Sequence, residues 1–280
     1  MTTLTVAAVA ANFGRDLEDA FARIKVLLDD ARSQGAALVV LPEATLGGYL
    51  ANLDGTADVS LPPALRVDGP EVKRLSQLAG DLVVTAGMCE ADGATRYNTA
   101  VAVNGDGVLG VHRKVHQPLG EGASYDAGGT FEAFDSPVGR IGMMICYDKA
   151  FPEAARSLAI DGADIVCCMS AWPAARTSPT PDLADDRWTR RFDLFDRARA
   201  LENQVLWVSA NQSGTFGSLR FVASAKVVDT GGDVLATTGT TSGIAYATVD
   251  LARMLDSARA GMFHLRDRRP DAYSLRTAPS

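Results

Sequence analysis

Residues 140–153 read RIGMMICYDKAFPE, and in them an apolar run meets a polar one at Cys146. The apolar part has the length and composition of a buried β-strand. Pro152 follows a few residues later, and proline is favoured in the first turn of a helix, so a helix is expected to start there. A cysteine between a strand and a helix can be a small buried side chain, a metal ligand, half of a disulfide or a nucleophile.

Strands and helices alternate on both sides of this stretch. Strands are predicted over residues 4–11, 36–44, 81–90, 97–103, 108–115, 139–146, 164–172 and 205–212, and helices over residues 16–35, 69–80, 152–163 and 187–204. The turn NGDG at 104–107 predicts a hairpin, and segments 221–229, 234–239 and 243–250 predict an antiparallel ribbon. This order predicts a single α/β domain in which helices cover the faces of a sheet.

Composition limits the classes of function. The chain has 280 residues and a net charge of −7, which argues against a nucleic-acid-binding protein, because such proteins carry a basic face. No apolar run reaches the roughly 18 residues of a membrane span, and the N-terminus lacks the basic region of a signal peptide. The four cysteines contain no C-x-x-C pair, which indicates neither a disulfide framework nor a zinc site and fits a reducing cytoplasm.

Two motifs lack the context that their usual function requires. GDGVLG, residues 105–110, matches G-x-G-x-x-G, but it lies in the predicted hairpin and opens no helix, so a dinucleotide site is not expected. His112 and His116 are four residues apart, but Arg113 stands where a metalloprotease motif has glutamate, and no third ligand is evident. The two histidines are therefore expected to be surface or network residues, and no metal is expected.

Three strand ends carry reactive side chains, namely Glu43, Lys114 and Cys146. Sites in α/β proteins form at such ends. For Cys146, the turn that follows predicts an exposed sulfur, and the start of the next helix favours its thiolate. A cysteine nucleophile usually takes a histidine as its base, so a Cys–His pair remains open at this point. The other cysteines lie inside strand patterns and are expected to be structural: Cys89, Cys167 and Cys168.

Three motifs in this order point to a family. LPEATLGGY (41–49), HRKVHQPLGE (112–121) and GRIGMMICYDKAFPEAARSLAIDGADIV (139–166) resemble the nitrilase superfamily of carbon–nitrogen hydrolases. Other segments that resemble it are YNTAVAV (97–103), SAWP (170–173), RALENQ (199–204) and SANQSG (209–214). The resemblance implies a four-layer α-β-β-α sandwich over residues 1–255 and a tail over 256–280, which is expected at a subunit interface. It also implies a homodimer or a larger homo-oligomer.

In that family a glutamate, a lysine and a cysteine form the catalytic triad, which the motifs place at Glu43, Lys114 and Cys146. The resemblance implies that Glu43 is the base for Cys146. It also implies that Lys114 stabilises the thiolate and the oxyanion. The usual pKa of a glutamate is about 4.3 and that of a thiol about 8.5. The site must therefore raise the pKa of Glu43 or couple proton transfer to attack. The N–H of Tyr147 is expected to be a second oxyanion donor, and no organic cofactor is implied.

Four more site residues follow from the same motifs. Many members carry a second glutamate after the lysine, and Glu121 is the candidate, unless it is an ordinary exposed loop residue. Tyr49 and Trp172 are expected either to line the substrate pocket or to be ordinary core aromatics. Lys149 departs from the family pattern, and it either binds a substrate carboxylate or lies exposed, as most lysines do.

Differences between this sequence and other branches of the family limit which carbon–nitrogen bond is expected to be cleaved. True nitrilases usually have Cys-Trp-Glu at the nucleophile, whereas this chain has CYDKAFPE, so nitrile hydrolysis is disfavoured. The first expectation for the substrate is a small primary amide that yields an acid and ammonia, and the second is an N-carbamoyl compound. Two rivals of other kinds are a catalytically silent binding protein on the same fold and a Cys–His hydrolase.

Overall fold

Strand β7 (Gly139–Ile145) ends immediately before Cys146, as the sequence predicts. In the computed structural model, which describes residues 3–55 and 61–274, β7 belongs to a sheet of mixed direction. Across this sheet lie, in order, β6 (Ala133–Ser136), β7, β8 (Ile165–Ser170), β9 (Leu206–Gln212), β12 (Lys226–Val228) and β13 (Val234–Thr237). Strands β7, β8 and β9 are parallel, which brings their carboxyl ends to one edge of the sheet.

A second sheet faces the first. Its strands are, in order, β5 (Gly107–Arg113), β4 (Thr95–Asn104), β3 (Val83–Asp92), β2 (Leu38–Val40), β1 (Leu4–Ala11) and β14 (Gly243–Val249). Strands β1, β2 and β3 are parallel, whereas β4 and β5 form the predicted antiparallel hairpin. The two sheets are joined where Ala10 of β1 pairs with Asn211 of β9.

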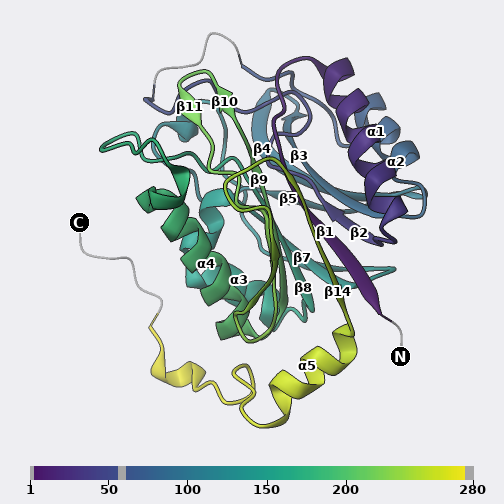
Figure 1. The fold of residues 1–280 in the computed structure, drawn as a ribbon, viewed down its shortest axis with the longest axis vertical. Coiled ribbons are helices and arrows are strands. Elements are labelled where there is room, and N and C mark those ends of the chain that lie inside the picture. Colours follow the sequence, from purple (N-terminus) through teal and green to yellow (C-terminus); the bar gives the residue numbers. More distant parts are fainter. Residues whose placement is uncertain (1–2, 56–60, 275–280) are drawn as a thin grey trace.

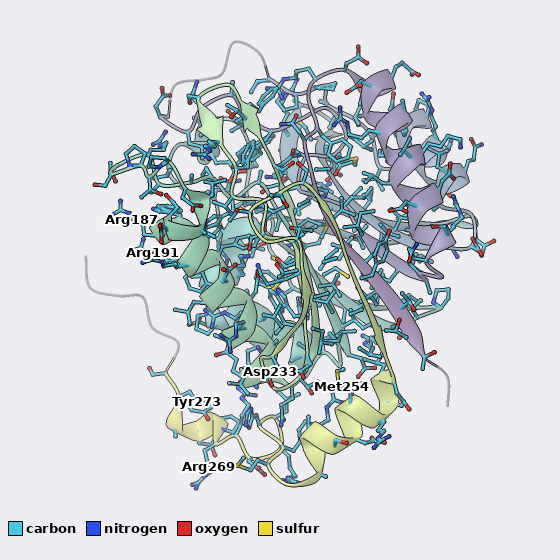
Figure 2. All side chains as sticks on the ribbon, viewed as in Figure 1. Arg187, Arg191, Asp233, Met254, Arg269 and Tyr273 are labelled. Carbon is cyan, nitrogen blue, oxygen red and sulfur yellow. The ribbon has the colours of Figure 1, made fainter. Side chains whose placement is uncertain are left out.

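Helices cover the outer faces of both sheets. α1 (Leu17–Ser33) and α2 (Pro70–Ala79) pack on the sheet that contains β1, and α3 (Pro152–Ile160) and α4 (Arg187–Asn203) pack on the sheet that contains β7 (Figure 1). Successive residues of a strand point to opposite faces. Met143 accordingly lies between the two sheets, whereas Met144 packs under α3 and α4. The four-layer α-β-β-α sandwich is confirmed, and side chains fill the space between its layers (Figure 2).

Local signals set the starts of these helices. The side chain of Asp16 accepts hydrogen bonds from the N–H groups of Glu18 and Asp19 at the first turn of α1. Pro70 and Pro152 open α2 and α3, where a missing N–H costs no intrahelical hydrogen bond. These caps are short-range features, so the sequence predicts each start to within about a residue.

The expectation of one ribbon near the C-terminus is wrong. β12 and β13 form a hairpin at the edge of one sheet, where β12 also pairs with β9, whereas β14 pairs along its length with β1 of the other sheet. β12 and β14 thereby pair with backbone groups along one edge of β9 and of β1, which would otherwise be unpaired there. Another small ribbon joins β10 (Thr215–Phe216) and β11 (Leu219–Arg220).

A last helix, α5 (Leu251–Ala260), follows β14 and runs across the domain boundary expected at residue 255. Leu255 is buried, and the side-chain amide of Gln204 donates to the carbonyls of Ala258 and Met262. Beyond α5 the chain continues through a short 3₁₀ helix (Pro270–Ala272), with Arg269 and Tyr273 beside it, apart from the sandwich (Figure 2). The location of the tail at a subunit interface stays a prediction, and residues 275–280 lie outside the described residues.

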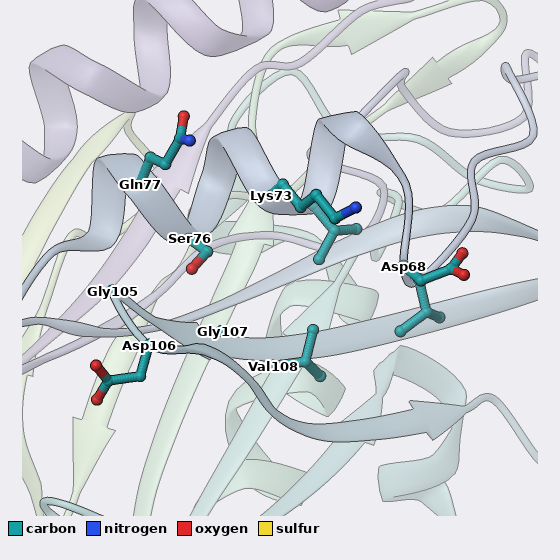
Figure 3. Close-up of a pocket in the computed structure, with 10 residues that line it drawn as sticks. Asp68, Lys73, Ser76, Gln77, Gly105, Asp106, Gly107 and Val108 are labelled. Atoms are coloured by element: carbon teal, nitrogen blue, oxygen red, sulfur yellow. The ribbon is translucent and has the colours of Figure 1, made fainter.

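The G-x-G-x-x-G match lies in the β4–β5 turn and the strand after it, as expected, and opens no helix. Figure 3 shows Gly105, Asp106 and Gly107 in this turn facing α2, across a surface hollow of about 390 Å³. Ser76 of α2, which lines the hollow, donates to the carbonyl of Asn104. Among the helices in the described part of the chain, none combines the length and hydropathy needed to cross a bilayer.

Candidate active site

Cys146 is the first residue of a short 3₁₀ helix, η2 (Cys146–Ala150), and has a φ of +51°. A non-glycine residue in this left-handed region is strained, so the surrounding structure must hold it there. The side chain is only 3 % exposed, so the expectation of an exposed sulfur is wrong. Cys146 lines a small cavity.

Glu43 follows β2 and is fully buried. Its Oε1 accepts hydrogen bonds from Nζ of Lys114 at 2.9 Å and from Nδ2 of Asn98 at 2.6 Å. Its Oε2 accepts the backbone N–H of Ala171, which follows β8 of the other sheet, at 2.5 Å. The carboxylate is therefore held at three points by groups from both sheets.

Lys114 follows β5 and is also fully buried. Its ammonium contacts two carboxylates, Oε1 of Glu43 at 2.9 Å and Oε2 of Glu121 at 2.7 Å. Glu121 opens the short 3₁₀ helix η1 (Glu121–Ala123) and is fully buried, so the alternative of an exposed loop glutamate is wrong. The structure thus brings together the three charged residues that the motifs singled out.

Asn98 on β4 completes this network, although the sequence motifs did not point to it. Its Nδ2 donates to Oε1 of Glu43 and, at 2.7 Å, to Oε1 of Glu121, while its carbonyl accepts the N–H of Lys114. One amide group therefore ties both carboxylates to the strand. The available signal was a polar side chain at the start of the apolar run YNTAVAV, at a strand position that faces the other sheet.

Because the site is buried, the ionisable side chains in it strongly shift one another's pKa values. Burial would lower the pKa of Lys114, but the charges of Glu121 and Glu43 outweigh it and hold that pKa well above its usual value. Burial raises the pKa of Glu121, and Glu43 adds to the rise while Lys114 opposes it. Burial also raises the pKa of the Cys146 thiol, with Glu43 adding to the effect. The resting sulfur is therefore a thiol, whereas the helix start after Cys146 predicted a thiolate.

Comparison with known proteins identifies the family of this chain. The family model described as carbon–nitrogen hydrolase matches residues 5–259. The chain belongs to the carbon–nitrogen hydrolase family. It is 32% identical to a nitrilase of Pyrococcus abyssi over 235 residues, and this alignment covers 82% of this chain and 83% of the nitrilase. It is 29% identical over 291 residues to the omega-amidase NIT2 of Mus musculus, which covers 98% of both chains.

The fold comparison agrees as well. A crystal structure of a carbon–nitrogen hydrolase from Helicobacter pylori G27 superimposes with a TM-score of 0.81, at 26% sequence identity and over 97% of both chains. The four-layer arrangement of this carbon–nitrogen hydrolase is therefore that of a solved member of its family. These two relatives carry the names of different chemistries, nitrilase and omega-amidase, so the names alone leave the bond that is cleaved undecided.

A cavity of about 20 Å³ adjoins Cys146 in this carbon–nitrogen hydrolase. Space of that size holds about one water molecule. Both predicted aromatics, Tyr49 and Trp172, line it, and the lining residues in the described part of the chain carry no formal charge. They are Tyr49, Leu53, Pro118, Leu119, Cys146, Tyr147, Ala171, Trp172, Pro173 and Trp188. Of these lining residues, Leu119 is 63 % exposed.

Lys149 and the two histidines do not line this cavity. Lys149 is fully buried, so the alternative of an exposed lysine is wrong, and its ammonium pairs with Asp196 at 2.8 Å. Nε2 of His112 and Nδ1 of His116 contact the buried carboxylate of Asp148, at 3.1 and 2.9 Å. The histidines are thus network residues, as expected, and each directs a ring nitrogen to Asp148.

Proposed function

We propose that this carbon–nitrogen hydrolase converts a small, uncharged primary amide to a carboxylic acid and ammonia through a thioester on Cys146. The observation that carries the proposal is the buried cluster of Glu43, Lys114, Glu121 and Asn98 beside a buried thiol and an uncharged cavity. A base and a fixed positive charge close enough to act on a nucleophile are the parts that acyl transfer requires, and of these groups Cys146 lines the cavity.

Acylation begins with the neutral thiol. Because burial raises the pKa of Cys146, proton transfer to Glu43 accompanies attack of the sulfur on the amide carbonyl. The carbonyl oxygen becomes an oxyanion, which the ammonium of Lys114 and the N–H of Tyr147 stabilise. When the tetrahedral intermediate collapses, the carbon–nitrogen bond breaks and Glu43 returns the proton to the departing ammonia.

Deacylation uses the same groups in reverse order. Glu43 takes a proton from a water molecule, whose oxygen attacks the thioester carbonyl. The carbon–sulfur bond breaks, the acid leaves, and the proton returns to the sulfur. Glu121 and Asn98 touch neither substrate nor sulfur in this scheme. They act by holding Lys114 and Glu43 in place.

The cavity supports a short and uncharged acyl group. A buried charge without a partner is costly, and the lining offers no ion to pair with a substrate carboxylate or amine. The small volume means that a substrate must displace side chains such as Leu119, and short acyl groups need the least displacement. An N-carbamoyl substrate is the second candidate. It ranks below a simple amide because its additional N–H would need a hydrogen-bond acceptor, and the side chains that line the cavity are largely apolar.

The test is ammonia release from a panel of aliphatic amides, ω-amides, nitriles and N-carbamoyl amino acids. Wild type and Cys146→Ala run side by side, and intact-mass measurement detects an acyl adduct on wild type. We expect wild type alone to turn over short aliphatic amides. A nitrile or carbamoyl compound as best substrate would contradict the proposed bond, and a folded wild type that binds amides without turnover would favour the silent binding protein.

A further inference from the structure

A buried ion cluster holds the segment that follows Cys146. We propose that Lys149 and Asp196 are positioning residues, which fix the nucleophile through η2 and the cavity wall through Trp172. This role rests on the proposed function, because it presumes that Cys146 is the nucleophile. Neither residue touches the cavity, so both would act through their neighbours.

The first observation is the strain at Cys146. A left-handed φ at a non-glycine residue persists only where the surroundings over-determine it. The helix η2 has five residues and 3₁₀ geometry, and so short a helix has few hydrogen bonds of its own. The groups that restrain η2 from outside must therefore supply most of the constraint.

Helix α4 provides several of these groups. Asp196 pairs with the ammonium of Lys149 at 2.8 Å. One turn further along α4, Arg199 donates from Nε to the carbonyl of Lys149 at 2.9 Å and from Nη2 to the carbonyl of Ala150 at 3.1 Å. The end of η2 opposite Cys146 is thus attached to α4 by one ion pair and two charge-assisted hydrogen bonds.

Asp196 is itself rigidly held. Its Oδ1 also accepts Nε1 of Trp207 at 2.9 Å, and its Oδ2 contacts Nζ of Lys226 at 3.1 Å. Burial would raise the pKa of Asp196, but the charges of Lys149 and Lys226 outweigh it and lower that pKa, so the carboxylate is ionised. Well-packed apolar side chains often stabilise a core as well as buried ions do. A cluster of this kind is more suited to fixing a single geometry.

The cluster also reaches the cavity wall. Nζ of Lys149 lies 3.1 Å from the ring centroid of Phe192 and 5.5 Å from that of Trp172, and these two rings contact each other at 5.9 Å. Trp172 lines the cavity. A displacement of Lys149 would therefore move the nucleophile and one wall of its cavity together.

Lys226→Met is the comparison variant. Lys226 is a second buried lysine on the same carboxylate, and its Nζ also lies 4.2 Å from the ring centroid of Phe192, but it lies on β12, and its other partners are Asp193 and the carbonyl of Ser224. The experiment compares Lys149→Met with Lys226→Met, each of which removes one ammonium and keeps an unbranched side chain. The readouts are kcat and KM for the best amide, the rate at which chloroacetamide alkylates Cys146, and the melting temperature. Peptide mass spectrometry assigns the alkylated cysteine.

For Lys149→Met we expect kcat and the alkylation rate each to fall by about 10- to 100-fold, with a smaller change in KM, because small misplacement of a reacting atom has effects of that size. For Lys226→Met we expect a comparable loss in melting temperature but a smaller fall in kcat and alkylation, because the ion pair between Asp196 and Lys149 and the two bonds from Arg199 still attach η2 to α4. Equal losses in both variants, or a normal alkylation rate in Lys149→Met, would overturn the proposal and leave a purely structural cluster.

Asp196→Asn is a second variant in case Lys149→Met does not fold. It keeps the shape of the side chain and one acceptor, and it should lower kcat and alkylation in the same direction as Lys149→Met. Near-normal kcat and alkylation in folded Asp196→Asn would overturn the proposal. The alkylation assay needs no amide turnover, so it separates a failure of this inference from a failure of the proposed function.

Discussion

At the scale of single residues, the site is governed by charge balance in a place without water. Two carboxylates, Glu43 and Glu121, share one ammonium, that of Lys114, and one amide, that of Asn98. Hydrogen bonds to charged groups are worth more than neutral ones, and an unmade one in a buried site is costly. Each of these four side chains is therefore expected to affect both stability and activity.

Replacement of Asn98 by alanine should lower kcat by about 10- to 100-fold. The variant removes one hydrogen bond to each carboxylate, and bonds to charged groups contribute about 1.5–3 kcal/mol each. Steady-state kinetics on the best amide and thermal unfolding measure the effect. Asn104→Ala, at the end of the same strand, removes bonds within the β4–β5 turn and should leave kcat unchanged. Equal kinetics of the two variants would refute the role of Asn98.

Replacement of Glu121 by glutamine should make stability less sensitive to pH and reduce kcat. The folded pKa of Glu121 is raised by burial, so this carboxyl group adds to stability below its unfolded pKa of about 4.3 and loses that contribution as pH rises through the folded value. Glutamine does not titrate, so the variant does not lose this contribution to stability as pH rises. The melting temperature of the variant minus that of wild type should therefore increase between pH 4 and pH 7, by ~2–4 °C for each kcal/mol.

Scanning calorimetry at several pH values measures this difference, and a difference that stays constant with pH would contradict the prediction. The loss in kcat has a separate cause, since Lys114 would no longer be held by a second charged partner. The wild type and the variant share Asp148 and all other titrating groups outside the cluster. Their contributions to the pH dependence therefore cancel in the difference.

At the scale of elements, the site depends on how closely strand β3 approaches the loop that carries Glu43. Gly87 of β3 accepts the N–H of Leu46 at 3.0 Å and donates to the carbonyl of Pro42 at 3.2 Å. A Cβ atom at residue 87 would lie 2.3 Å from the N of Ala44 and 2.7 Å from Cα of Glu43. Both contacts are with backbone atoms, so no flexible side chain can move away.

Gly87→Ala should therefore push the Glu43 loop off β3. Overpacking of this kind typically costs about 1–3 kcal/mol, and the displaced base should lower kcat more than it raises KM. Kinetics and chemical denaturation check the two effects. Gly129→Ala is the control, because no heavy atom lies within 4 Å of the added Cβ and the φ of Gly129 lies outside the left-handed region. If Gly87→Ala keeps full activity, the Glu43 loop is not set by this contact.

At the scale of the whole molecule, the site exists only because the two sheets pack together. Glu43 and Lys114 follow strands of one sheet, whereas Cys146 and Ala171 follow strands of the other. Residues from both sheets form the core between them. Either sheet without the other would hold only part of the cluster.

The expected homo-oligomer can be tested on the outer face of α4. Leu194 and Leu201 are seven residues apart on one side of this helix and are 66 % and 48 % exposed. If subunits stack on this helical layer, Leu194→Glu combined with Leu201→Glu should convert the assembly to monomers in multi-angle light scattering. Val26→Glu on α1, at an exposed position of the opposite layer, should leave the mass unchanged. A monomeric wild type would contradict the prediction.

The sequence by itself determined the order of elements and the positions of the reactive residues. Strand and helix periodicity, the cap at Asp16 and the prolines that open α2 and α3 act over a few residues, so their effects can be predicted locally. The end of β7 at Cys146 belongs to the same class, because an apolar run followed by a polar turn is a local pattern.

Only the tertiary structure decided which of these residues meet and how far they are buried. Asn98 contacts Glu43 across 55 residues of chain, and Lys149 contacts Asp196 across 47. Whether Cys146 rests as a thiol or a thiolate, and whether Lys149 is exposed or paired, depends on desolvation and on charges from distant segments. β14 likewise found its partner in β1, at the other end of the chain, because pairing follows which strand edge is free and not proximity in sequence.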